Sequence, residues 1–282
     1  MKTDGVMVEG AGLEYPDRGR AEPLSPQRTA VCLVYDDAGT GEPAVVLVHG
    51  WGFGNPSAFV PQFEHLAKRR RVLKLDLPGH GRSDQSPPGF GWKDCAAAIV
   101  GTLDAAGVDR AVVCGHSFGG RMAIEVAAAY PSRVAGIALL DPVILFPEGL
   151  RQQAITGLVP ALASEHWLQA LEGYFSRLLS PYDPPELKSQ VLSELAQVSP
   201  EMAAPIMQEG MATDGSDCLA RVQCPVLLVS AGAPVDIERF RELQPEAFIG
   251  SVVGSGHWLT LAVPDQVNAM LNRFLEIAPA RG

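Results

Sequence analysis

The stretch that decides the fold is residues 111–120, which reads AVVCGHSFGG. An apolar run leads into a serine, Ser117, and a segment of helical period begins near Arg121. A serine on a sharp strand-to-helix turn has a strained backbone and needs small residues two positions before and after it, because the flanking chains approach closely. Gly115 and Gly119 stand at these positions. We therefore predict that Ser117 is a nucleophile, with the N-terminus of the next helix favouring negative charge beside it.

The chain on either side of this turn alternates short apolar runs with segments of helical period from Ala44 onward. Continuous apolar runs predict a mostly parallel sheet with helices covering both faces, an α/β fold. The first 30 residues predict a short edge strand followed by irregular chain. The expected strands are residues 31–35, 45–49, 72–76, 111–115, 134–140, 226–230 and 248–253.

The strand pattern stops between Pro142 and Arg221, and helical stretches around residues 152–162, 166–179 and 185–197 replace it. We expect a helical cap over residues 142–221, placed above the carboxyl ends of the strands, with residues 1–141 and 222–282 forming the core. The cap is rich in large apolar side chains, most of which we expect to pack within it: Trp167, Tyr174, Phe175, Tyr182, Met202, Met207 and Met211.

Two turns upstream of Ser117 fit the same plan. Residues 49–52 read HGWG after an apolar run, and a turn loosened by glycine can aim a backbone N–H at a substrate oxyanion. We predict the Trp51 and Phe118 amides as this oxyanion hole, and His49 as a structural hydrogen-bonding residue. Residues 76–84 read DLPGHGRSD, a turn typical of scaffold rather than of chemistry.

The order and spacing of four segments, residues 49–52, 76–84, 115–120 and 254–257, resemble the α/β-hydrolase superfamily, and the resemblance covers about residues 43–275. It implies an α/β-hydrolase fold with a helical cap inserted after strand 6. The superfamily includes esterases, lactonases, C–C bond hydrolases, epoxide hydrolases, dehalogenases and cofactor-free dioxygenases. Epoxide hydrolases and dehalogenases carry Asp at the sharp strand-to-helix turn, the nucleophile elbow, where this chain has Ser117.

A serine hydroxyl needs a neighbouring imidazole to take its proton. His257 follows an apolar run and a Gly-Ser-Gly turn late in the chain, where the superfamily places its base. The third residue of the triad is ambiguous, because no acid stands at the usual Gly-x-x-Asp position after residues 226–230. Asp141, at the end of the run 134–140, is favoured over Asp236, which has the features of a helix N-cap.

The composition excludes several classes of protein. A net charge of -10 argues against a nucleic-acid or membrane surface, and the basic run 68–71 is expected to be a solvated helix end. Five scattered cysteines predict neither disulfides nor a zinc site, and therefore a cytoplasmic location. Neither a signal peptide nor a membrane-spanning segment is apparent. No Gly-x-Gly-x-x-Gly follows a strand, which sets aside a dinucleotide fold.

We therefore expect a serine hydrolase that cleaves a small apolar carboxylic ester or lactone through an acyl-enzyme, with no cofactor and no metal, as a monomer or homodimer. His116, Trp167 and Trp258 are further candidates for substrate contact. The alternatives are a cofactor-free dioxygenase, in which His257 and Asp141 deprotonate an aromatic substrate, a C–C bond hydrolase, and a ligand-binding homologue with little turnover.

Overall fold

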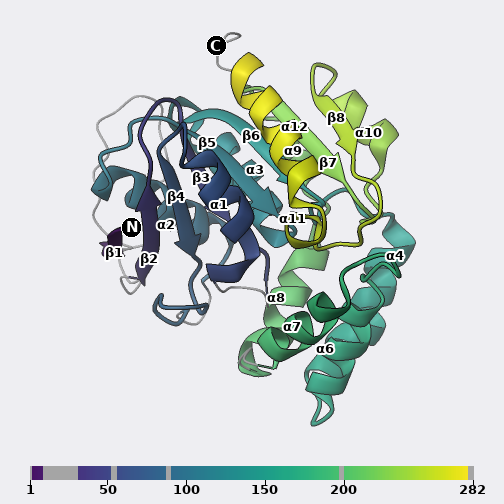
Figure 1. Ribbon diagram of the computed structural model, residues 1–282. Helices are drawn as coiled ribbons and strands as arrows, with labels where there is room; N and C mark the ends of the chain where they lie inside the picture. The colour runs from purple at the N-terminus through teal and green to yellow at the C-terminus, as the bar shows by residue number, and fades with distance from the viewer. Residues whose placement is uncertain (1, 9–30, 52–55, 87–89, 197–199, 279–282) are drawn as a thin grey trace.

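The computed structural model describes residues 2–8, 31–51, 56–86, 90–196 and 200–278. The irregular chain expected within residues 9–30, and Gly52 of the HGWG turn, lie outside this range. The described chain forms an eight-stranded sheet with helices on both sides and a second, helical lobe beside it (Figure 1). Its strands are β1 (Lys2–Val8), β2 (Val31–Ala38), β3 (Ala44–Val48), β4 (Val72–Asp76), β5 (Ala111–His116), β6 (Val134–Leu140), β7 (Val226–Ser230) and β8 (Phe248–Ser251).

The strand order is β1-β2-β4-β3-β5-β6-β7-β8. β2 pairs antiparallel with β1 and β4, and every pair from β4 to β8 is parallel. This is the mostly parallel sheet that the sequence predicts, and the seven expected strands are all present. The last strand ends two residues earlier than expected, at Ser251.

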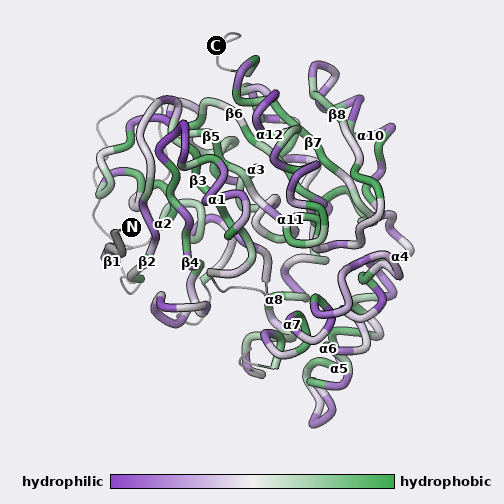
Figure 2. The backbone as a smooth tube through the Cα atoms, in the orientation of Figure 1, coloured by the Kyte–Doolittle hydropathy of each residue, from purple (hydrophilic) through white to green (hydrophobic). Residues whose placement is uncertain are grey.

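The continuous apolar strands reflect burial on both faces of the sheet. In β3, Val45 and Leu47 belong to one hydrophobic cluster, whereas Val46 and Val48 belong to the other, because successive side chains point to opposite faces. Figure 2 shows hydrophobic colouring along the central strands. The first cluster includes side chains of the helices α1 (Val60–Leu66), α11 (Leu259–Ala262) and α12 (Pro264–Ile277). The second cluster includes side chains of α2 (Trp92–Ala105), α3 (Phe118–Ala129), α9 (Ser216–Leu219) and α10 (Ile237–Leu243).

The chain between β6 and β7 is helical, as the sequence predicts for residues 142–221. It forms α4 (Glu148–Gln153), a π-helical turn η3 (Ala154–Leu158), α5 (Val159–Leu162), α6 (Trp167–Ser176), α7 (Pro185–Leu195), α8 (Pro200–Ala212) and α9. Most of these helices make up the separate lobe in Figure 1. The sequence pattern predicts no helix at α8, which carries Pro205 in its interior, a residue that usually interrupts a helix. Two 3-10 turns, η1 (Pro56–Phe59) and η2 (Pro131–Arg133), complete the described elements.

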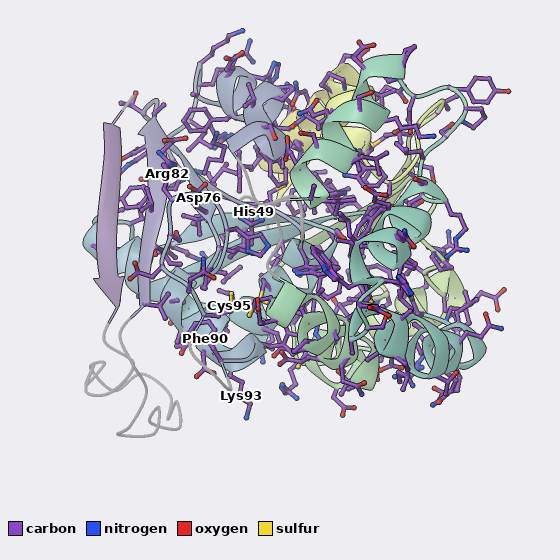
Figure 3. All side chains as sticks on the ribbon, turned by 90° about the horizontal axis from the view of Figure 1, so that it is seen from below. His49, Asp76, Arg82, Phe90, Lys93 and Cys95 are labelled. Carbon is purple, nitrogen blue, oxygen red and sulfur yellow. The ribbon has the colours of Figure 1, made fainter. Side chains whose placement is uncertain are left out.

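The turn after β4 is held by ion pairs. The Asp76 carboxylate accepts hydrogen bonds from the Arg82 main chain at 3.1 Å and from its Nε at 2.8 Å, and Arg82 also pairs with Asp36 at 2.9 Å. Figure 3 shows Asp76, Arg82 and His49 near one another. These contacts stabilise the turn that the sequence analysis interpreted as scaffold. Within the described ranges, no helix combines the length and apolar character needed to cross a membrane.

Candidate active site

Ser117 lies at the sharp turn between β5 and α3, with φ 55° and ψ -120°. A positive φ is costly for any residue with a Cβ. The glycines beside it are required by close approach of the backbone. A Cβ on Gly115 would lie 2.0 Å from the Gly119 carbonyl oxygen, and a Cβ on Gly119 would lie 2.0 Å from that of Val48. The sequence signature of the elbow therefore has a direct steric cause.

His257 reaches the serine from the loop that follows β8. Its Nε2 lies 2.9 Å from Ser117 Oγ, which is hydrogen-bonding distance for proton transfer. Both side chains are buried, with 5% exposure for Ser117 and 6% for His257. The structure thus brings the predicted nucleophile and the predicted base, which lie 140 positions apart in the sequence, into hydrogen-bonding distance.

Asp141 is the carboxylate that contacts His257. It follows β6, and its Oδ2 lies 2.7 Å from His257 Nδ1. The other oxygen, Oδ1, accepts hydrogen bonds from the backbone N–H groups of Ala231, Gly232 and Ala233 at 2.7, 3.1 and 3.0 Å. The loop after β7, where the superfamily usually carries the acid, here supplies amides that bind the acid of the neighbouring strand.

The surroundings of Asp141 favour its charged form. Burial by itself would raise the pKa, but the hydrogen bond and charge of His257 and the amides of Ala231 and Gly232 outweigh it and lower the pKa of Asp141 to about 2. The carboxylate is fully buried. A permanently ionised acceptor at Nδ1 holds the proton on that nitrogen and leaves Nε2 free to accept one.

Asp236, the second candidate acid, caps a helix. It is the N-cap of α10, and its Oδ1 accepts a hydrogen bond from the Arg239 N–H at 3.0 Å. The side chain is therefore used in the local role that its sequence context predicts.

The turn of residues 49–51 lies directly against the serine. A Cβ on Gly50 would lie 2.9 Å from Ser117 Cβ and 3.4 Å from Ser117 Oγ. The Trp51 indole packs on Phe118, with ring centroids 6.1 Å apart. Phe118 is the first residue of α3, and the first amides of a helix lack an intrahelical acceptor. The two amides predicted as an oxyanion hole thus belong to the two backbone segments that flank Ser117.

His49 and His116 are buried, neutral and structural. His49 Nε2 accepts a hydrogen bond from the Leu77 N–H at 2.8 Å, and its Nδ1 donates to the Gly50 carbonyl at 2.8 Å. Burial, and then the charge of His80, lowers the pKa of His49 to about 3. Burial, and then the charge of His257, lowers the pKa of His116 to about 3. A neutral ring, with one N–H, fits the hydrogen bonds that His49 and His116 make.

A cleft of about 650 Å³ lies between Ser117 and the helices that follow β6. Apolar side chains, including Leu158, Phe175 and Met211, line it together with Ser117 and His257. Its polar lining residues are mainly exposed side chains of the helical lobe, namely Gln153, Gln169 and Arg177. The cleft therefore offers an apolar surface next to the hydroxyl, with polar groups toward solvent.

The three expected substrate contacts do not line this cleft and remain predictions. Among the described residues that line the cleft, His116, Trp167 and Trp258 are absent. His116 Nε2 donates instead to the His257 carbonyl at 2.7 Å. Trp258 is 1% exposed and packs on Phe175, with ring centroids 5.9 Å apart, while Trp167 packs against the hydrophobic cluster. Burial of the large apolar ring of Trp258 in the core stabilises the fold.

Two of the cleft residues that sequence reasoning missed are glycines. Gly157 and Gly173 both line the cleft, and a Cβ on either would meet no atom within 4 Å. Glycine inside a helix is unfavourable by about 1 kcal/mol relative to alanine, and that mismatch is the one sequence signal that could have marked them. Among the described residues, no cluster of three or more His, Cys, Asp or Glu side chains is placed to hold a metal ion.

The chain is a member of the α/β hydrolase family, whose model matches residues 45–270. It is 28% identical over 250 residues to the dihydrolipoyllysine-residue acetyltransferase component of the acetoin cleaving system of Pseudomonas putida. The match covers 86% of this chain and 65% of that protein, so the chain spans slightly less than two thirds of the length of this relative. It is 29% identical to a pimeloyl-[acyl-carrier protein] methyl ester esterase of Xanthomonas oryzae, covering 84% of this chain and 96% of the other.

Solved structures share the fold over most of their length. Est816, described as an N-acyl homoserine lactone degrading enzyme, superposes with a TM-score of 0.77 at 25% identity, covering 86% of this chain and 97% of the other. The family membership, together with these esterase and lactone-degrading neighbours, supports a hydrolase.

Proposed function

We propose that the protein is a serine hydrolase that cleaves a carboxylic ester or lactone through an acyl-enzyme. The observation that carries the proposal is the unbroken set of contacts from Ser117 Oγ to His257 Nε2 at 2.9 Å and from His257 Nδ1 to Asp141 Oδ2 at 2.7 Å. An imidazole held between a hydroxyl and a carboxylate in this geometry can take the serine proton and stabilise the charge it acquires. The esterases and lactonases among the similar proteins support the same chemistry.

The reaction proceeds in two halves on these residues. Ser117 attacks the substrate carbonyl as His257 takes its proton, and the Trp51 and Phe118 amides stabilise the oxyanion. His257 then returns the proton to the leaving alcohol. Water, deprotonated by His257, attacks the acyl-enzyme. As the bond between the acyl carbon and Ser117 Oγ breaks, His257 returns this proton to Ser117 Oγ and the acid is released. For a lactone, the leaving hydroxyl stays attached to the acyl group and departs with it.

The cleft supports a substrate with an apolar acyl or alcohol part of moderate size. Its volume of about 650 Å³ falls in the range of small-molecule sites. The helical lobe of residues 142–221 contributes most of the residues that line the cleft, and we assign it the role of a cap that shapes the substrate site.

Hydrolysis of chromogenic short-acyl esters and of lactones tests the proposal. Ser117→Ala is expected to lower kcat by several orders of magnitude, because it removes the nucleophile. Ser164→Ala, at an exposed serine of the cap, is the matched control and should leave kcat unchanged. Wild-type turnover by Ser117→Ala would refute the acyl-enzyme mechanism. Oxygen uptake that survives this substitution would select the cofactor-free dioxygenase alternative.

A further inference from the structure

The loop that carries His257 is held by the cap as well as by the core. The chain between α6 and α7 runs against it, so that the His257 N–H donates to the Leu178 carbonyl at 2.9 Å. One residue earlier, the Gly256 N–H donates to Asp183 Oδ1 at 2.9 Å. Two successive amides of the histidine loop are therefore bound by one segment of the cap.

Asp183 links two pieces of backbone with its two oxygens. While Oδ1 binds the Gly256 amide, Oδ2 accepts the Ser180 N–H at 2.7 Å. The Asp183 N–H also donates back to the Ser180 carbonyl at 3.1 Å, which closes a tight turn. Hydrogen bonds to an ionised acceptor are roughly twice as strong as those between neutral groups. The carboxylate thus fixes both the shape of the cap turn and its attachment to the histidine loop.

The cap segment approaches the backbone of Gly256 too closely for a residue with a Cβ. A Cβ there would lie 2.4 Å from the Leu178 carbonyl oxygen, 2.6 Å from the Ser180 nitrogen and 3.0 Å from Asp183 Oδ2. All three atoms belong to the cap segment. The glycine directly before the histidine is therefore required by the docking of the cap onto this loop.

The core holds the same residue from the other side. His116 Nε2 donates to the His257 carbonyl at 2.7 Å. The main chain of His257 is thus fixed at its N–H by Leu178 and at its carbonyl by His116, and the preceding amide is fixed by Asp183. Movement at any of these points shifts the ring relative to Ser117 Oγ, and a displacement of 1 Å at a reacting group can lower the rate about 100-fold.

We propose that Asp183 is a positioning residue for the catalytic base, through which the cap sets the place of His257 as well as shaping the cleft. The inference rests on the proposed function, in which His257 is the base. It makes the turnover of every substrate depend on Asp183, including short esters that do not extend along the cap.

The test compares Asp183→Ala and Asp183→Asn in the full chain. Alanine removes both acceptors, whereas asparagine keeps one oxygen and can bind only one of the two N–H groups. The control is Tyr182→Ala, in the same turn, where the side chain is 80% exposed. The readouts are kcat and KM for a short-acyl ester, normalised to active sites titrated with a small fluorophosphonate, and the rate at which that probe modifies Ser117.

We expect Asp183→Ala to lower kcat about 10- to 100-fold, with KM within about twofold and with probe reactivity reduced in parallel. Asp183→Asn should lie between Asp183→Ala and wild type, and Tyr182→Ala should match wild type. A kcat per titrated site that stays at the wild-type level in Asp183→Asn and in any folded Asp183→Ala, even with a lower melting temperature, would overturn the inference and leave a purely structural contact. Activity retained by Ser117→Ala would instead refute the proposed function, on which the role of Asp183 rests.

Discussion

Replacing Asp141 by asparagine tests the centre of the proposed mechanism. The asparagine oxygen can take the place of Oδ1 and accept the amides of residues 231–233. The NH2 group then faces His257 Nδ1, where Oδ2 lies at 2.7 Å in the native chain. Because that group can only donate, Nδ1 must become an acceptor, and the ring proton moves to Nε2, opposite Ser117 Oγ. The imidazole then cannot take the serine proton.

The expected loss follows from this wrong tautomer. A base held in the wrong tautomer lowers kcat by about 10³ to 10⁴, which corresponds to about 4 to 5 kcal/mol of transition-state stabilisation. KM should change little, because Asp141 is fully buried and does not line the cleft. Hydrolysis of a chromogenic ester at neutral pH, with circular dichroism to verify folding, measures the effect.

Asp236→Asn is the matched control. Asparagine and aspartate are equally good N-caps, so the control should keep kcat within about twofold and the free energy of unfolding within about 0.5 kcal/mol. If Asp141→Asn kept more than a tenth of wild-type kcat, or if Asp236→Asn lost activity a thousandfold, the assignment of the acid would be refuted.

Two further predictions concern the cleft and acid stability. Gly173→Leu should fill the cleft and lower kcat/KM for long-chain esters at least about tenfold while sparing acetate esters. Gly173→Ala should instead raise the free energy of unfolding by up to about 1 kcal/mol. An equal loss of kcat/KM for both ester lengths in Gly173→Leu would argue against the placement of Gly173 in the substrate cleft. His49 and His116 have pKa values of about 3 in the folded chain, against 6.5 for a free imidazole, so both bind fewer protons when folded than when unfolded. The free energy of unfolding should therefore fall by about 4 kcal/mol as the pH is lowered from 7 to 5. Denaturant titrations that give the same free energy of unfolding across this range would contradict the prediction.

The elbow could be predicted because its requirements are local. Ser117 needs an apolar strand before it, a helix after it and glycines at 115 and 119, and all of these lie within one short segment. The same holds for the strands, whose continuous apolar runs follow from burial on both faces. His257 was identified by its place after a strand and a turn of small residues.

The partners that depend on neighbouring strands could not be decided in this way. Asp141 and Asp236 both follow apolar runs, and only the pairing of β6 with β7 brings the amides of Ala231 and Ala233 onto the Asp141 carboxylate. The roles of the aromatic candidates Trp167 and Trp258 could not be decided from the sequence for a related reason, since an apolar ring fits a core and a ligand site equally well until the packing is known.

The sequence by itself determined the family, the mostly parallel sheet and the pairing of a serine at a tight turn with a late histidine, because each of these leaves a pattern in residues close along the chain. Tertiary structure alone decided which carboxylate contacts that histidine, which residues line the cleft and how Asp183 reaches Gly256. These contacts join segments far apart in sequence, whose distances are set by the stacking of strands and the docking of the cap.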